Sequence, residues 1–148
     1  MINLMPEIHP LVIHFPIALL SSAILFDFIY ILSGREDLSQ TGWWGLLLGL
    51  VSAGAGITTG IWNDTLIGHL GTVTPFWLNH GWVQIFSCII FLSLFAWRTK
   101  YPQTMNHSIQ KWLFIFIGAV AIAVLFYGGH LGAKLADQIG RASCRERV

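Results

Sequence analysis

The stretch from Pro10 to Leu32, PLVIHFPIALLSSAILFDFIYIL, decides the fold class of this protein. It holds a single carboxylate, Asp27, and neither lysine nor arginine. As a helix it is long enough to cross the ~30 Å hydrocarbon core of a bilayer. A water-soluble chain of 148 residues is too small to bury several segments of this kind. The stretch therefore predicts a membrane-spanning helix.

Three further apolar stretches follow the first. By length and hydropathy we expect spans at residues about 42–62, 78–97 and 111–130, with tryptophans near their ends as in an interfacial belt. The chain is 55% hydrophobic and only 10% charged, against about 25% charged in ordinary soluble domains. Because spanning backbone must satisfy its own hydrogen bonds, and no alternating barrel pattern appears, each span should be helical. The predicted fold class is all-α, a polytopic membrane protein built as a four-transmembrane-helix bundle.

The last ten residues differ abruptly in composition from the apolar, glycine-rich sequence before them. Residues 139–148, IGRASCRERV, correspond codon for codon to a common sequencing adapter. We therefore interpret them as read-through rather than native sequence and leave them out of the fold analysis. Residues 1–138 then form a single four-span domain.

Charged residues in the short connections predict the orientation. Arg35 follows the first span, and Arg98, Lys100 and Lys111 lie between the third and fourth. On the other side, the N-terminal segment and the connection between the second and third spans contain no lysine or arginine. The C-terminal segment contains only Lys134 before the suspected adapter residues. By the positive-inside rule, both termini should lie outside.

Histidines gather on the predicted outer side. At 1.5 Å per residue from the inner ends of their spans, His14, His80 and His130 lie ~27, ~26 and ~29 Å up. Three histidines on three helices should thus reach one depth, with His9 and His69 able to approach from above. Ionisable groups within a membrane are costly and tend to mark function. We expect a site at this depth, although chance co-location and plain hydrogen bonding remain alternatives.

Other polar residues inside the spans suggest supporting roles. Gln84 and Cys88 follow His80 on one helix face, with Ser87 beside them. They are either partners of the histidine site or polar links between helices. Asp27 should be an interfacial residue that reaches water or Arg35, with a proton relay as the alternative.

Several function classes find no support in the sequence. No nucleophile–base pair, phosphate loop or pair of catalytic carboxylates can be assembled, so we expect no enzyme activity from the chain alone. There is no CxxCH for covalent haem. The near-neutral charge balance gives no reason to expect nucleic-acid binding.

The opening HPLVIHFPIALL, from His9 to Leu20, resembles a family of bacterial membrane proteins called domain of unknown function family 2231. The resemblance covers residues 8–138 and implies a four-span protein of the bacterial cytoplasmic membrane. By analogy with members found beside haem or iron–sulfur domains, it also implies membrane redox work. The matching positions are His9, Pro10, Leu11, His14, Phe15, Pro16, Thr59, Gly60, His80, Gly128, Gly129 and Gly132.

Three functional hypotheses follow. The leading one is a haem b-binding electron-transfer subunit with His14 and His80 as axial ligands, His130 as the alternative ligand, and a redox partner on the outer side. The second is a zinc or copper site made by the same three histidines. The third is a non-catalytic membrane subunit whose histidines hydrogen-bond to neighbouring helices. In the first two, His9, His69 and Gln84 would support the ligands, and in all three the surroundings are membrane lipid.

Overall fold

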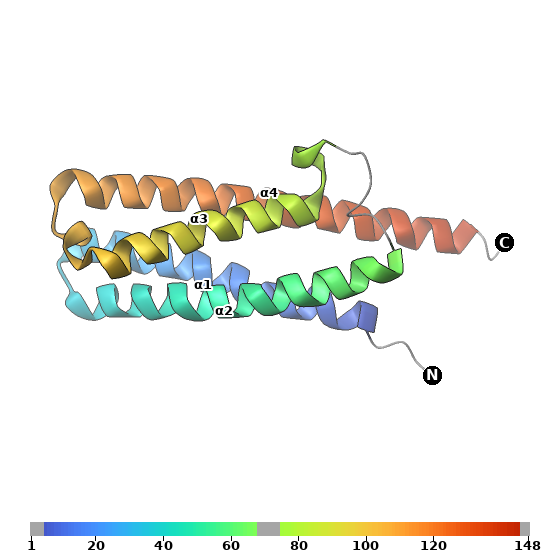
Figure 1. The fold of residues 1–148 in the computed structure, drawn as a ribbon, viewed down its shortest axis with the longest axis horizontal. Helices are drawn as coiled ribbons and strands as arrows, with labels where there is room; N and C mark the ends of the chain where they lie inside the picture. Colours follow the sequence, from blue (N-terminus) through green and yellow to red (C-terminus); the bar gives the residue numbers. More distant parts are fainter. Residues whose placement is uncertain (1–4, 68–74, 146–148) are drawn as a thin grey trace.

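The protein is a bundle of long helices without strands in the part of the chain that the structure describes (Figure 1). This computed structural model describes the backbone of residues 5–67 and 75–145, and the side chains of residues 12–62, 75–135 and 137. The helices are α1 (Met5–Ser33), α2 (Glu36–Ile67), α3 (His80–Lys100) and α4 (Ser108–Arg145), with short 3₁₀ helices η1 (Phe76–Leu78) and η2 (Pro102–Met105).

All four long helices have the length and apolar composition of membrane spans. The spanning parts are Val12–Ser33, Glu36–Trp62, His80–Lys100 and Ser108–Leu135, which confirms the four-span fold. Only 22–33% of the most apolar part of each span is buried within the bundle. The rest is apolar surface that is unfavourable in water and suits a lipid environment.

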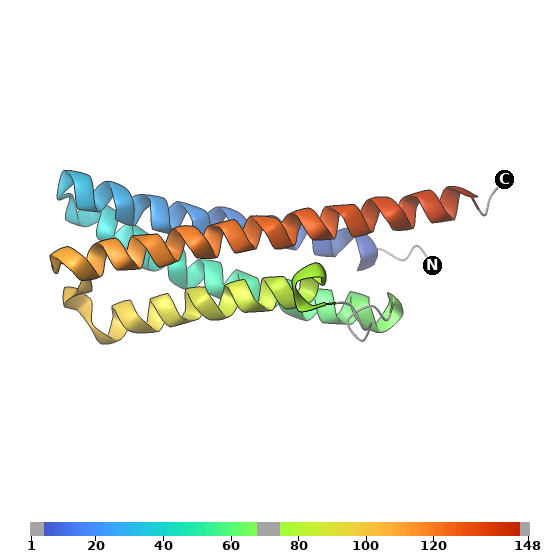
Figure 2. The same ribbon diagram turned by 90° about the horizontal axis from the view of Figure 1, so that it is seen from above.

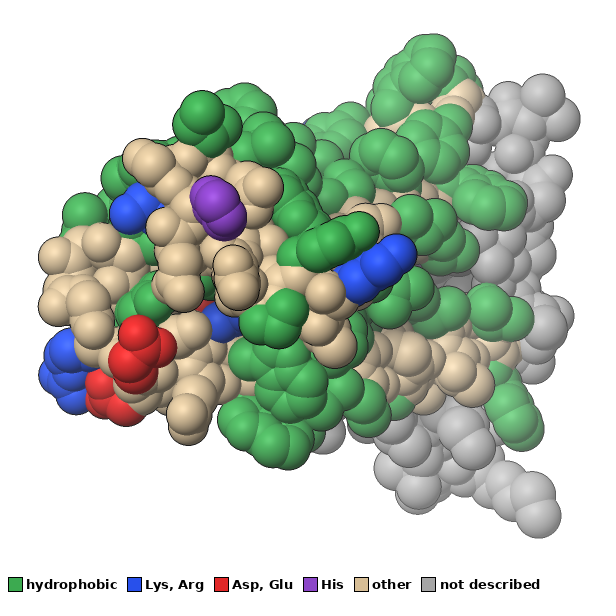
Figure 3. Space-filling model, turned by 60° about the vertical axis from the view of Figure 1, so that its left-hand side comes forward, with side chains coloured by type: hydrophobic (Ala, Val, Ile, Leu, Met, Phe, Trp, Pro, Cys, Tyr) green, Lys and Arg blue, Asp and Glu red, His purple; other side chains and the backbone are tan. Residues whose placement is uncertain are grey.

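The chain forms two helical hairpins, α1 with α2 and α3 with α4. Figures 1 and 2 show both termini at one end of the bundle, which we call the terminal end. The α1–α2 and α3–α4 connections lie at the other end. We call this second end the basic end because it carries Arg35, Arg98, Lys100 and Lys111. Figure 3 shows charged side chains at this end and hydrophobic ones along the flank.

The connection between α1 and α2 is shorter than the sequence suggested. Gly34 ends α1 with φ +71°, and its N–H donates to the Tyr30 carbonyl oxygen at 2.8 Å. A residue without a Cβ adopts this left-handed conformation at little cost. Glu36 and Asp37, expected in the loop, instead form the first turn of α2, where carboxylates interact favourably with the helix dipole.

The glycines of α2 bring α1 close. A Cβ on Gly45 would lie 3.0 Å from the Ala23 Cβ, and one on Gly49 would lie 2.6 Å from Leu20 Cδ2. Gly56 faces Ile13 at 3.7 Å. This stripe therefore serves close helix packing, as expected for small residues in lipid.

Candidate functional site

The most deeply buried charges of the described chain form an ion pair near the basic end. The Asp27 carboxylate of α1 accepts a hydrogen bond from the Arg98 guanidinium of α3, and the two side chains are 0% and 5% exposed. The expectation that Asp27 reaches water or Arg35 is therefore wrong, since Arg35 instead pairs with Asp37 at 2.6 Å. Helix packing turns Asp27 inward, and the long Arg98 side chain reaches it from the end of α3.

The ion pair is part of a set of contacts that joins all four long helices. Arg98 also donates to the Ser39 carbonyl oxygen of α2 at 2.5 Å and to its hydroxyl oxygen at 3.1 Å. The guanidinium carbon lies 5.9 Å from the centroid of the Phe114 ring on α4. One side chain therefore contacts all three other helices, so Arg98 acts as a clamp between the hairpins.

Gly42 makes room for this clamp. A Cβ built on Gly42 would come within 2.7 Å of Asp27 Cγ and 3.1 Å of the Ala23 carbonyl oxygen. One carboxylate oxygen of Asp27, Oδ1, is buried and has no hydrogen-bond partner. A buried oxygen of this kind is costly to leave unsatisfied. The pair therefore depends on close packing around it.

A second polar contact lies beside the clamp. The Tyr30 hydroxyl is within hydrogen-bond distance of a carboxylate oxygen of Glu36 at 3.4 Å and of the Asn106 amide oxygen at 3.3 Å. These contacts join α1 to the start of α2 and to the connection between η2 and α4. The contact between Tyr30 and Asn106 therefore adds to the Arg98 clamp in joining the two hairpins at the basic end.

Polar side chains on one face of α3 bond to α4. Ser87 donates to the Ala121 carbonyl oxygen at 3.1 Å, and Gln84 Nε2 donates to the Leu125 carbonyl oxygen at 3.3 Å. Gln84 also packs where Gly128 lacks a side chain, with 3.0 Å between its amide carbon and a Cβ built there. Gln84 and Ser87 are thus polar links between α3 and α4.

The histidines of the predicted site occupy different surroundings. His80 is half-buried against α4, with its Nδ1 3.5 Å from a Cβ built on Gly132. His14 on α1 and His130 on α4 are exposed. The side chain of His9 and all of His69 lie outside the described residues. Among the described side chains, no group of three His, Cys, Asp or Glu is arranged to hold a metal ion.

Comparison with known proteins places the chain in a family. The profile of a family described as "Predicted membrane protein (DUF2231)" matches residues 5–144. The chain belongs to this family. No curated protein and no solved structure matches it.

The DUF2231 match covers all four helices, so the opening histidine motif and the Asp27–Arg98 clamp lie in one family domain. The family resemblance of the opening motif is therefore confirmed. Sequence reasoning missed the clamp because Arg98 was counted as a loop charge. The first and third spans run in the same direction, so a carboxylate and a cation that each lie within two turns of the end of their span were the available signal.

Proposed function

We propose that this DUF2231 protein binds haem b near the outer face of the bacterial cytoplasmic membrane and passes electrons to a partner on that side. His14 and His80 are the preferred axial ligands, and His130 is the alternative. The supporting observation is that these histidines lie at nearly one level along the bundle.

Helix contacts support this shared level. His80 faces Gly132, two residues beyond His130 on the same helix. Ile24 on α1 packs against Gly118 on α4, which runs antiparallel to α1, and a Cβ built on Gly118 would lie 2.7 Å from Ile24 Cδ1. Ten residues back from Ile24 along α1 lead to His14. Ten residues onward from Gly118 along α4 lead to Gly128, which therefore lies at about the level of His14. At 1.5 Å per residue, His14 is then within ~6 Å of the level of His80.

The residues at this level fit the chemistry of a haem site. Imidazole is a common axial ligand, and a bis-histidine haem needs two histidines rather than three. Ser21, two turns from His14 on the same α1 face, has a buried hydroxyl oxygen without a hydrogen-bond partner. When bound, the haem iron would supply one-electron chemistry, and the chain would supply the ligands and a membrane setting.

A second candidate is a non-catalytic subunit in which His80 only packs helices together. It is favoured by the hydrogen bonds from Gln84 and Ser87 to α4, since these residues share a helix face with His80. In that case the histidines contribute to stability and bind no cofactor.

Visible spectra of protein purified in mild detergent from haem-replete cells test the proposal. A haem b protein should show paired reduced bands, and His14→Ala or His80→Ala should abolish or shift them. His107→Ala, an exposed histidine at the opposite end, should change nothing. A colourless protein with bound zinc or copper would support the metal site instead. A colourless, metal-free protein that His80→Ala destabilises would support the packing role.

A further inference from the structure

A cavity of about 440 Å³, open to the surface, lies at the basic end, at the corner formed by α3, η2 and the start of α4. Its lining residues include the polar Lys100, His107, Gln103 and Gln110 and the aromatic Trp97 and Tyr101. No Asp or Glu is among these lining residues. The cavity therefore offers hydrogen-bond donors and a positive charge without a competing carboxylate.

Local structure holds these groups in place. Lys100 Nζ lies 5.5 Å from the centroid of the Tyr101 ring, and the ring of Trp97 packs on Phe114 with centroids 6.0 Å apart. In the η2 turn, the Thr104 hydroxyl donates to the Tyr101 carbonyl oxygen at 2.7 Å. The backbone N–H of His107 donates to the Gln103 carbonyl oxygen at 3.2 Å. Hydrogen bonds of the η2 turn thus fix the backbone of the corner, from which the exposed side chains of Lys100, Gln103 and His107 extend.

The start of α4 adds to the positive potential. His107 precedes α4 and Gln110 lies in its first turn, and this turn contains no acidic residue. The first N–H groups of a helix have no intrahelical partners, and the helix dipole favours an anion there. Lys100, Gln103 and Gln110 thus line a cavity beside a helix start, a combination suited to a phosphate group.

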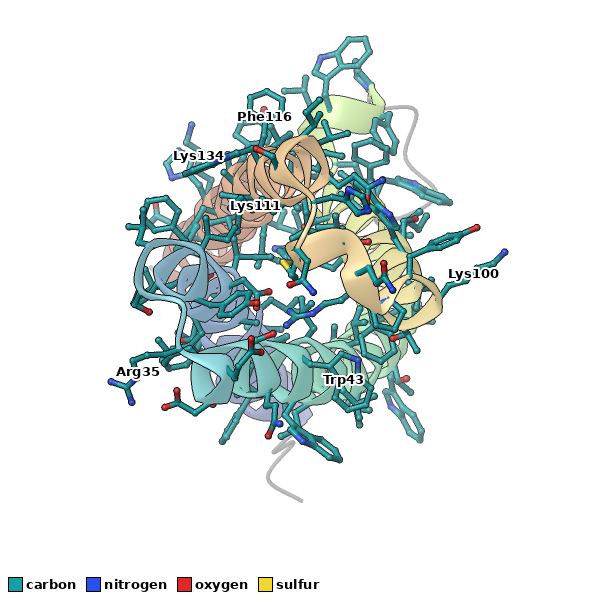
Figure 4. All side chains as sticks on the ribbon, turned by 90° about the vertical axis from the view of Figure 1, so that its left-hand side faces the viewer. Arg35, Trp43, Lys100, Lys111, Phe116 and Lys134 are labelled. Atoms are coloured by element: carbon teal, nitrogen blue, oxygen red, sulfur yellow. The ribbon has the colours of Figure 1, made fainter. Side chains whose placement is uncertain are left out.

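The position of the cavity identifies the source of that phosphate. The third span ends at Lys100 and the fourth begins at Ser108, so the cavity lies where lipid headgroups meet the bundle. Trp97 and Tyr101 are the aromatic residues expected at this depth. Figure 4 shows Lys100 extending outward from this corner, on the opposite side of the bundle from Arg35.

We propose that this cavity binds the phosphate headgroup of an anionic phospholipid in the leaflet at the basic end. Lys100 supplies the charge, while His107, Gln103 and Gln110 direct hydrogen bonds to the phosphate oxygens. The aromatic rings of Trp97 and Tyr101 line the approach from the acyl-chain region. Basic pockets of this kind between spanning helices are recognised by anionic lipid headgroups.

The experiment measures the thermal stability of the purified full chain in mild detergent while phospholipid is added. Phosphatidylglycerol should raise the melting temperature in a saturable manner, and phosphatidylcholine should not. Lys100→Gln should weaken the apparent affinity about fivefold, the expected effect of one lysine near a lipid headgroup. Lys100→Arg should restore most of it.

Lys111→Gln is the matched control, because Lys111 lies at the same end but is not among the lining residues. It should leave the affinity unchanged. Equal effects of Lys100→Gln and Lys111→Gln would overturn the proposal in favour of general surface charge. Equal stabilisation by both lipids would also overturn it. If inorganic phosphate alone gave the full stabilisation, the lipid assignment would be wrong. Should Lys100→Gln not fold, the comparison of Gln103→Ala with Lys111→Gln decides the same question.

Discussion

Replacing Asp27 by Asn tests whether the buried clamp holds the hairpins together. The substitution keeps the shape of the side chain but leaves the Arg98 guanidinium, 5% exposed, without a compensating charge. Removing one partner of a buried ion pair costs about 3–5 kcal/mol. Because Arg98 keeps its hydrogen bonds to the Ser39 carbonyl and hydroxyl oxygens, we expect the lower end, about 3 kcal/mol.

The assay is the free energy of unfolding, measured by titration with a denaturing detergent in mixed micelles. Arg98→Met should also destabilise the protein, because it leaves the Asp27 carboxylate buried without its partner. The double variant should lose clearly less than the sum of the two single losses. Arg35→Met is the matched control, since the Arg35 side chain is 66% exposed and its pair with Asp37 lies at the surface. It should change the stability very little.

Two results would refute this reasoning. Strictly additive losses in the double variant would show that the two charges do not interact in the folded protein. A loss for Asp27→Asn no larger than that for Arg35→Met would show that Asp27 is not buried as described.

Further predictions concern packing, topology and the chain end. Gly42→Ala should cost about 1–3 kcal/mol by forcing a methyl group against the Asp27 carboxylate, whereas Gly54→Ala, with nothing within 4 Å, should cost nothing. Ser87→Ala should cost about 0.6 kcal/mol, the average for hydrogen bonds between spanning helices, and unchanged stability would contradict the Ala121 contact. A topology reporter fused after Gln138 should score as external, and a cytoplasmic score would reverse the proposed orientation. Sequencing the source gene should show codons other than those of residues 139–148 after Gln138, while recovery of the same codons would make that segment native.

The sequence by itself determined the number and nature of the helices. Hydropathy is a property of each residue, and an apolar stretch such as residues 10–32 must be helical in lipid regardless of which segments pack against it. Helix ends were less certain, because Glu36 and Asp37 suit a loop or a first helical turn equally well until the Gly34 turn is known.

Only the tertiary structure decided which polar groups meet. Asp27 and Arg98 are far apart in the chain, and their pairing depends on the rotation of α1 and α3 and on the space left by Gly42. The same holds for the histidines. Counting residues along each span estimated their depth, but rotation about each helix axis left His80 against Gly132 and His14 and His130 exposed. Depth is a property of one helix, whereas contact is a property of two, and the rotation that settles it comes from the packing of the whole bundle.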